Sequence, residues 1–223
     1  MRPVTVRPLA ERIAFVRAHT APTAPPLLPE LRLHTATAVT PLWQATEDWL
    51  ERQGLGPPFW AFPWAGGQAV ARHVLDDPGL VRGRRVLDFA AGSGLIGIAA
   101  ALAGAASVRA VDIDPLAEAA CAANADLNGV ALDIGTADIV GEDLADVDVL
   151  LVGDVCYERP MAERVTAWLR ARAAAGTLVL LGDPGRAYLP SDGLGRLAVH
   201  TVPTTRELED REERVTTVWR VLG

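Results

Sequence analysis

From about residue 67 onward, short apolar segments alternate with segments of helical periodicity, and this alternation constrains the fold more than any other feature of the sequence. Apolar strands that alternate with helices are typical of a parallel sheet that helices cover on both faces. We expect helices at 67–75, 95–103, 115–128 and 160–174, and strands at 85–89, 108–111, 132–136, 147–152 and 177–181. Two later apolar runs, at 197–202 and 215–221, have no helical pattern between them and are predicted to pair as an antiparallel hairpin.

The residues before this pattern are organised differently. Residues 9–18 have the spacing of a short amphipathic helix, and the prolines of 22–29 end it and predict an extended linker. Four of the six tryptophans then lie close together, which indicates either a packed cap or a wall for a flat or cationic ligand; they are Trp43, Trp49, Trp60 and Trp64. We expect one domain of 223 residues, with an N-terminal extension over 1–57 and a core over 58–223.

The charge balance indicates which classes of partner to expect, and the cysteine content indicates the cell compartment. Twenty-one basic residues against 28 acidic ones give a net charge of −7, so no overall positive field is present to hold a phosphate backbone. The apolar runs are interrupted well short of the roughly 20 residues that a membrane-spanning helix requires. The two cysteines, Cys121 and Cys156, show no metal-ligand spacing. We therefore expect a cytoplasmic protein without a metal site, a nucleic-acid partner or a membrane span.

A glycine-rich turn joins the strand at 85–89 to the helix at 95–103. Gly92, Gly94 and Gly97 have G-x-G-x-x-G spacing, in which the missing side chains let a ligand approach the backbone. Asp112 ends the next strand, where a carboxylate can accept hydrogen bonds from ribose hydroxyls. The turn therefore predicts a nucleoside ligand, but on its own it fits a dinucleotide as well.

Asp88, at the end of the strand before the turn, separates these two ligands. A carboxylate there would repel a pyrophosphate at the helix N-terminus by about 1–4 kcal/mol at about 4 Å. The ammonium and sulfonium groups of S-adenosyl-L-methionine would instead be attracted to it. The alternative is that Asp88 and Asp112 only cap the local turns.

Longer sequence patterns indicate a family. The turn VLDFAAGSG and the following VDIDP resemble those of the seven-strand, class I S-adenosylmethionine-dependent methyltransferases. PFWAFPWAGGQAVARHVLDDP at 58–78 and GDVCYERP at 153–160 resemble the protein-lysine methyltransferases with a D-x-x-Y signature. LLGDPGR at 180–186, TTVWRV at 216–221 and PELRLHTA at 29–36 are similar to the electron transfer flavoprotein beta subunit lysine methyltransferases and their bacterial relatives.

This resemblance implies a Rossmann-like α/β sheet of seven strands, mostly parallel with an antiparallel last strand, and S-adenosyl-L-methionine over the carboxyl ends of the first strands. It also implies a set of cofactor-binding residues: Trp64, Asp88, Ala90, Gly92, Gly94 and Asp112, with Asp138 and Ile139 at the adenine edge. Asp154 and Tyr157 match the D-x-x-Y pair, at the point where the acceptor enters.

The implied reaction is methyl transfer to lysine side chains of a protein such as the electron transfer flavoprotein beta subunit. The predicted catalytic residues are Asp154, Tyr157 and Trp60. Asp154 would hold and orient the amine, and Tyr157 would hydrogen-bond it or shape the channel. Trp60 and Phe62 would desolvate the amine and so favour its neutral form. In-line displacement needs no protein nucleophile, so Cys156 is expected to be buried packing.

Other functions and other roles stay open from the sequence alone. A small-molecule N-methyltransferase acting on nicotinamide or a similar heterocycle would need a closed aromatic pocket rather than an open rim. A non-catalytic nucleoside-binding or partner-binding protein could keep the same fold, whereas Asp88 opposes a dehydrogenase. Asp183 and Arg186 either shape the acceptor entrance or only fix their loop, and His34 could line the site.

Overall fold

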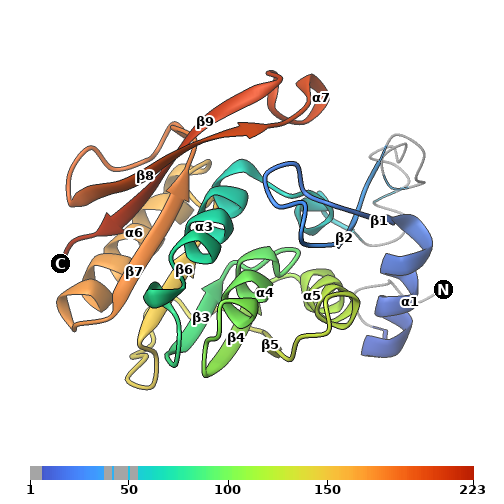
Figure 1. The fold of residues 1–223 in the computed structure, drawn as a ribbon, viewed down its shortest axis with the longest axis horizontal. Helices are drawn as coiled ribbons and strands as arrows, with labels where there is room; N and C mark the ends of the chain where they lie inside the picture. Colours follow the sequence, from blue (N-terminus) through green and yellow to red (C-terminus); the bar gives the residue numbers. More distant parts are fainter. Residues whose placement is uncertain (1–6, 38–41, 43–49, 51–54) are drawn as a thin grey trace.

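The computed structural model describes residues 7–37, 42, 50 and 55–223, and its centre is a seven-stranded sheet (Figure 1). The strands are β3 (Arg85–Phe89), β4 (Ser107–Asp112), β5 (Asp133–Thr136), β6 (Val149–Val152), β7 (Leu178–Asp183), β8 (Leu194–Pro203) and β9 (Glu213–Val221). Their order in the sheet is β5-β4-β3-β6-β7-β9-β8, and β3 to β7 are parallel. β9 runs antiparallel to both of its neighbours, which confirms the predicted hairpin and the antiparallel last strand.

Helices cover both faces of the sheet, as the sequence pattern predicts. They are α1 (Leu9–His19), α3 (Ala65–Asp76), α4 (Leu95–Leu102), α5 (Pro115–Leu127), α6 (Arg159–Ala174) and the short α7 (Arg206–Glu209). Successive strand side chains point to opposite faces. Accordingly Leu87 and Leu150 pack against Trp168 of α6, whereas Val86 and Leu151 pack against α3 and α4.

The start of α5 follows from local chemistry. Asp114 is its N-cap and accepts a hydrogen bond from the backbone N–H of Leu116 at 2.8 Å, and Pro115 occupies the first turn. On its outer side α5 holds α1, where Arg12 pairs with Glu118 at 2.7 Å (Figure 1). The N-terminal helix therefore lies beside the helix that follows β4.

The stretch at 22–29 is not an extended linker, so that prediction is wrong. β1 (Ala21–Thr23) and β2 (Leu33–Thr35) pair as a small antiparallel sheet around it. Leu28 and Leu31 are fully buried against α3 and α4. Proline spacing indicated the end of α1 correctly, but it carries no information on which leucines the neighbouring helices cover. The hairpin connection likewise contains the four-residue α7, for which the sequence shows no helical pattern.

The strand order reverses at β3, which has β4 on one side and β6 on the other. In open α/β sheets ligands bind beyond the carboxyl ends of the strands at such a reversal. The residues that follow β3, β4, β6 and β7 therefore meet at one edge of the sheet, called the carboxyl edge below. None of the helices that the structure describes is both long and apolar enough to cross a bilayer.

Candidate active site at the carboxyl edge

The chain leaves β3 through a turn that only small residues can form. Ala90, Gly92 and Gly94 have φ values of +52°, +53° and +77°. A Cβ atom on Gly94 would lie 3.0 Å from the sulfur of Cys121, so α5 also requires glycine there. Ala90 is exposed and Gly92 is partly exposed, which leaves the backbone of the turn open to a ligand.

Asp112 joins this turn to the end of β4. Its Oδ2 accepts a hydrogen bond from the N–H of Gly92 at 2.9 Å, and its Oδ1 accepts one from the N–H of Asp114 at 3.0 Å. Burial raises the pKa of Asp112, and these backbone hydrogen bonds oppose the rise. The backbone N–H of Ile113 also contacts this carboxylate, and since a carboxylate offers about four lone pairs, an acceptor site remains for a further donor.

The structure corrects the reason given for Asp88. Its carboxyl is fully buried beneath the turn, where Oδ2 accepts a hydrogen bond from the N–H of Gly97 at 2.8 Å. Oδ1 has no hydrogen-bond partner among the described residues. Burial raises the pKa of Asp88 to about 8, and the nearby Asp112 adds to the rise. The group is therefore mostly neutral at pH 7 and does not act on a ligand as an exposed negative charge.

Asp138 and Ile139 lie beside Asp112, because the N–H of Ala137 donates to the carbonyl of Asp112 at 3.0 Å. The Asp138 carboxylate is exposed and pairs through both oxygens with Arg164 of α6, which holds its pKa below the usual range. The Ile139 side chain is buried against α6. Only its backbone could therefore contact a ligand, so a side-chain role for Ile139 is excluded in this structure.

Asp154 follows β6 and is buried among hydrogen-bond donors. Its Oδ1 accepts hydrogen bonds from Nε and Nη2 of Arg186 at 3.0 and 2.8 Å, and its Oδ2 accepts one from the N–H of Gly66 at 2.5 Å. Burial raises the pKa of Asp154 to about 6, although Arg186 opposes the rise. A Cβ atom on Gly66 would overlap this carboxylate and the carbonyl of Gly182, so glycine is required where α3 meets β7.

Three aromatic side chains, called the aromatic rim below, lie together at this edge: Phe59, Trp64 and Tyr157. The Phe59 ring lies 6.0 Å from that of Trp64 and 5.7 Å from that of Tyr157, and the indole N–H of Trp64 donates to the carbonyl of Phe59. Phe59 and Tyr157 are 48% and 45% exposed. Trp64 and Tyr157 are predicted site residues, whereas Phe59 is not among them.

The structure also corrects the predicted role of Trp60. Its side chain is 2% exposed and packs with Val16 of α1 and Leu116 of α5. It therefore stabilises the contact of the N-terminal helix and cannot desolvate an acceptor at the rim. The density of aromatic residues indicated this segment, but not which of the two neighbours, 59 or 60, faces outward. Trp43 and Trp49 lie outside the described residues.

The remaining side chains that the sequence analysis named as candidates, Asp183, Cys156 and His34, are held in contacts that stabilise the fold. Asp183 accepts hydrogen bonds from the N–H groups of Gly185 and Arg186 at 2.6 and 2.7 Å, which fixes their loop. Cys156 is buried, and burial raises the pKa of its thiol to about 12, as expected for packing rather than nucleophilic chemistry. His34 is buried and donates its backbone N–H to Asn124. No cluster of three or more potential metal ligands occurs among the described residues.

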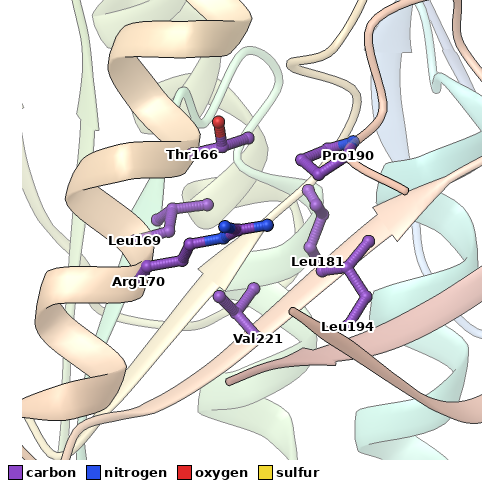
Figure 2. Close-up of a pocket in the computed structure, with 7 residues that line it drawn as sticks. All are labelled: Thr166, Leu169, Arg170, Leu181, Pro190, Leu194 and Val221. Carbon is purple, nitrogen blue, oxygen red and sulfur yellow. The ribbon is translucent and has the colours of Figure 1, made fainter. Parts of the chain in front are cut away.

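Two hollows in the surface lie away from these groups. Figure 2 shows one between α6 and the strands, where Leu169 and Arg170 face Leu181 and Val221. The other is polar and lies at the amino ends of β3 and β6, beside Arg85. Neither contains a predicted site residue, and the predicted site residues that the structure brings together lie at the carboxyl edge.

The sequence of this chain is similar to those of known protein methyltransferases. The sequence profile of the ribosomal protein L11 methyltransferase (PrmA) family matches residues 73–153. The electron transfer flavoprotein beta subunit lysine methyltransferase of Xenopus laevis is 38% identical over 213 residues, which are 92% of this chain and 85% of that protein. The protein of the same name from Homo sapiens is 33% identical over 216 residues, which are 92% of this chain and 80% of that protein.

Among solved structures, magnesium protoporphyrin IX methyltransferase of Synechocystis PCC 6803 with bound S-adenosylmethionine superposes with a TM-score of 0.52 at 19% identity. The match covers 70% of this chain and 79% of that one. At this identity the similarity concerns the fold, which is that of the class I methyltransferases.

Proposed function

The chain belongs to the electron transfer flavoprotein beta subunit lysine methyltransferase family, and on this premise we propose that its substrate is the beta subunit of an electron transfer flavoprotein. It is a protein-lysine N-methyltransferase that uses S-adenosyl-L-methionine. The relatives that are named for this substrate match the present chain over most of their own length. A net charge of −7 also suits a partner that presents a basic, lysine-bearing surface.

The groups at the carboxyl edge fit this cofactor. Asp112 keeps an acceptor site for a ribose hydroxyl, and the exposed backbone at 90–92 can receive the amino-acid part. Asp138, at the same edge, can accept a hydrogen bond from the adenine amino group. The cofactor supplies the electrophilic methyl group, and these residues bind and orient it. Asp88 acts indirectly, because it holds α4 through Gly97.

The acceptor lysine must reach the methyl group as a neutral amine. With an ordinary pKa near 10.4, neutral lysine at pH 7 costs about 3.4 pKa units, or about 4.6 kcal/mol. The aromatic rim lowers this cost, since apolar surroundings disfavour the ammonium form. Asp154 is largely ionised above pH 6 and can accept a hydrogen bond from the amine, which orients its lone pair. In-line alignment of the two groups then supplies much of the rate.

The observation that best supports a protein as the methyl acceptor is the open aromatic rim beside the buried carboxylate of Asp154. Phe59 and Tyr157 are about half exposed, so a side chain standing out from a protein surface can approach the Asp154 end of the site alongside these rings. A small heterocycle such as nicotinamide would be better held in a closed pocket. The exposure of the rim therefore favours the protein acceptor over the small-molecule one.

The test is incubation of the purified protein with tritiated S-adenosyl-L-methionine and purified electron transfer flavoprotein. We expect label in the beta subunit, with mass spectrometry locating it on lysine. Asp154→Asn should retain binding of S-adenosylhomocysteine but transfer little label. Parallel reactions contain a cell extract or nicotinamide in place of the flavoprotein. Label in other proteins of the extract but not in the flavoprotein would contradict the proposed substrate, and label in nicotinamide alone would contradict a protein acceptor.

A further inference from the structure

We propose, on the basis of the proposed function, that Arg186 is a positioning residue of the acceptor site, which fixes the orientation of the Asp154 carboxylate and is itself held by Glu209. Arg186 lies in the loop after β7, and Glu209 belongs to α7 in the β8–β9 connection. From the sequence alone Arg186 either shapes the acceptor entrance or only fixes its loop, and Glu209 has no predicted role.

The guanidinium of Arg186 lies between two carboxylates. Its Nε and Nη2 donate to Oδ1 of Asp154 at 3.0 and 2.8 Å. Its Nη1 and Nη2 donate to Oε2 and Oε1 of Glu209 at 2.9 and 2.7 Å. Since a guanidinium has five N–H donors, four of them are directed at these two side chains. The contact with Glu209 joins two donors to two oxygens and so fixes the relative plane of the two groups, whereas the two donors to Asp154 fix the position of its Oδ1.

The contacts are shielded from solvent. The side chains of Asp154, Glu209 and Arg186 are 7%, 2% and 18% exposed. Arg214 of β9 adds a second positive charge, donating to Glu209 at 3.1 Å, so two carboxylates face two guanidiniums. Although burial by itself lowers the pKa of Arg186, its bonds to Glu209 and Asp154 raise it above the ordinary value. The guanidinium therefore stays charged across the working pH range.

This arrangement leaves Asp154 one acceptor direction. Arg186 fills both lone pairs of Oδ1, and the N–H of Gly66 fills one of the two on Oδ2. The remaining lone pair is the place for the lysine amine. Without Arg186 either oxygen could face the acceptor, and the orientation of the amine would no longer be unique.

Arg186 also couples Asp154 to the aromatic rim. Its Cζ lies 5.9 Å from the centre of the Trp64 ring, within the range of a cation–π contact. Trp64 is the N-cap residue of α3, two positions before the Gly66 that donates to Asp154. The guanidinium therefore touches the groups on both sides of the acceptor position.

The proposal predicts a change in the pH dependence of methylation. Asp154 is faced by Arg186 from the loop after β7, by Asp183 at the end of β7 and by Glu209 of α7, with Cys156 and Tyr157 following it in the chain. The two carboxylates and burial raise the pKa of Asp154, and only Arg186 among these groups lowers it. Loss of Arg186 should therefore move the acid limb of the kcat/KM profile to higher pH.

The experiment compares Arg186→Gln, Arg186→Lys and Glu209→Gln with the control Arg85→Gln. Arg85 also donates two hydrogen bonds to a carboxylate, that of Asp148, but it does so at the amino ends of the strands and in an exposed position. For Arg186→Gln we expect kcat/KM for the protein acceptor to fall at least about tenfold and the acid limb to move up by about one pH unit. Binding of S-adenosylhomocysteine should stay within about twofold. Arg186→Lys should recover part of the loss, and Arg85→Gln should change none of these quantities.

A direct titration keeps the test independent of activity and of the substrate. Carboxyl-carbon NMR of ¹³C-aspartate protein, assigned with Asp154→Asn, should show the Asp154 titration at higher pH in Arg186→Gln, and an unmoved titration there would overturn the proposal. Should Arg186→Gln not fold, Arg186→Lys and Glu209→Gln decide by kcat/KM for the acceptor and by binding of S-adenosylhomocysteine. Unchanged kcat/KM in both of these variants would then overturn the proposal. Failure of the wild-type protein to label an electron transfer flavoprotein would contradict only the proposed substrate.

Discussion

The Oδ2 atom of Asp112 accepts a hydrogen bond from the backbone N–H of Gly92 at 2.9 Å, although the two residues are far apart in the chain. This bond ties the carboxyl end of β4 to the turn that follows β3. We propose that Asp112 holds the ribose and that the turn holds the amino-acid part of the cofactor. This hydrogen bond fixes the positions of the two relative to each other. Disturbing either should weaken cofactor binding.

Asp112→Asn should weaken the affinity for S-adenosylhomocysteine about 10- to 100-fold. Hydrogen bonds to a charged group contribute about 1.5–3 kcal/mol, and the amide can accept from only one side. Isothermal titration calorimetry measures the change, with Asp133→Asn as the control, because Asp133 is exposed at the start of β5. An affinity within twofold of the wild type would mean that Asp112 does not hold the ribose.

Gly94→Ala should lower both the melting temperature and the affinity for the cofactor. The new Cβ would lie 3.0 Å from the Cys121 sulfur, and the backbone has a φ of +77°. Gly129→Ala separates the two effects, since Gly129 has a φ of +65° but no atom within 4 Å of an added Cβ. We expect a loss of about 1 kcal/mol for Gly129→Ala and a clearly larger one for Gly94→Ala. Equal losses, measured by thermal unfolding, would show that the contact with Cys121 is unimportant.

Asp88→Asn should make the protein less sensitive to alkaline pH. The folded-state pKa of about 8 lies above the ordinary value of 3.8, so the folded state holds a proton that the unfolded state releases. The stability contributed by this proton is therefore fully present below about pH 4 and is lost as pH rises towards 8. Asparagine keeps the oxygen that accepts from Gly97 but does not titrate.

Between pH 6 and pH 8 we expect Asp88→Asn to gain about 2 kcal/mol relative to the wild type. In a domain of this size that gain corresponds to about 4–8 °C in Tm. Thermal unfolding at the two pH values checks it. A Tm difference that does not change with pH would show that Asp88 is ionised in the folded state, and the interpretation of its burial would be wrong.

Phe59→Ala should reduce methylation activity without loss of stability, whereas Trp60→Ala should reduce the stability of the fold. Removing the exposed Phe59 ring should reduce kcat/KM for the protein acceptor about tenfold with little change in Tm, because the rim loses one of its three rings. Removing the buried Trp60 ring should cost about 3–5 kcal/mol of stability. Paired measurements of Tm and methylation rate test this. A stable Trp60→Ala protein with a specific loss of methylation would restore Trp60 to the acceptor site.

The sequence by itself determined the parts that depend on neighbouring residues. The spacing of apolar residues located the strands and most helices, and Asp114 with Pro115 marked the start of α5 because capping is a contact within one turn. The turn at Gly92 and Gly94 was predictable because positive φ values select glycine. These features need no knowledge of distant parts of the chain.

Only the tertiary structure decided the contacts between distant residues. Asp88 is buried under α4, where it is mostly neutral and accepts a hydrogen bond from Gly97 instead of presenting an exposed charge. Trp60 packs against α1 and is buried, whereas Phe59 is exposed. The pairing of Arg186 with Asp154 joins two loops that follow different strands. No local pattern encodes these arrangements, because the charge and exposure of a side chain depend on what the folded chain brings against it.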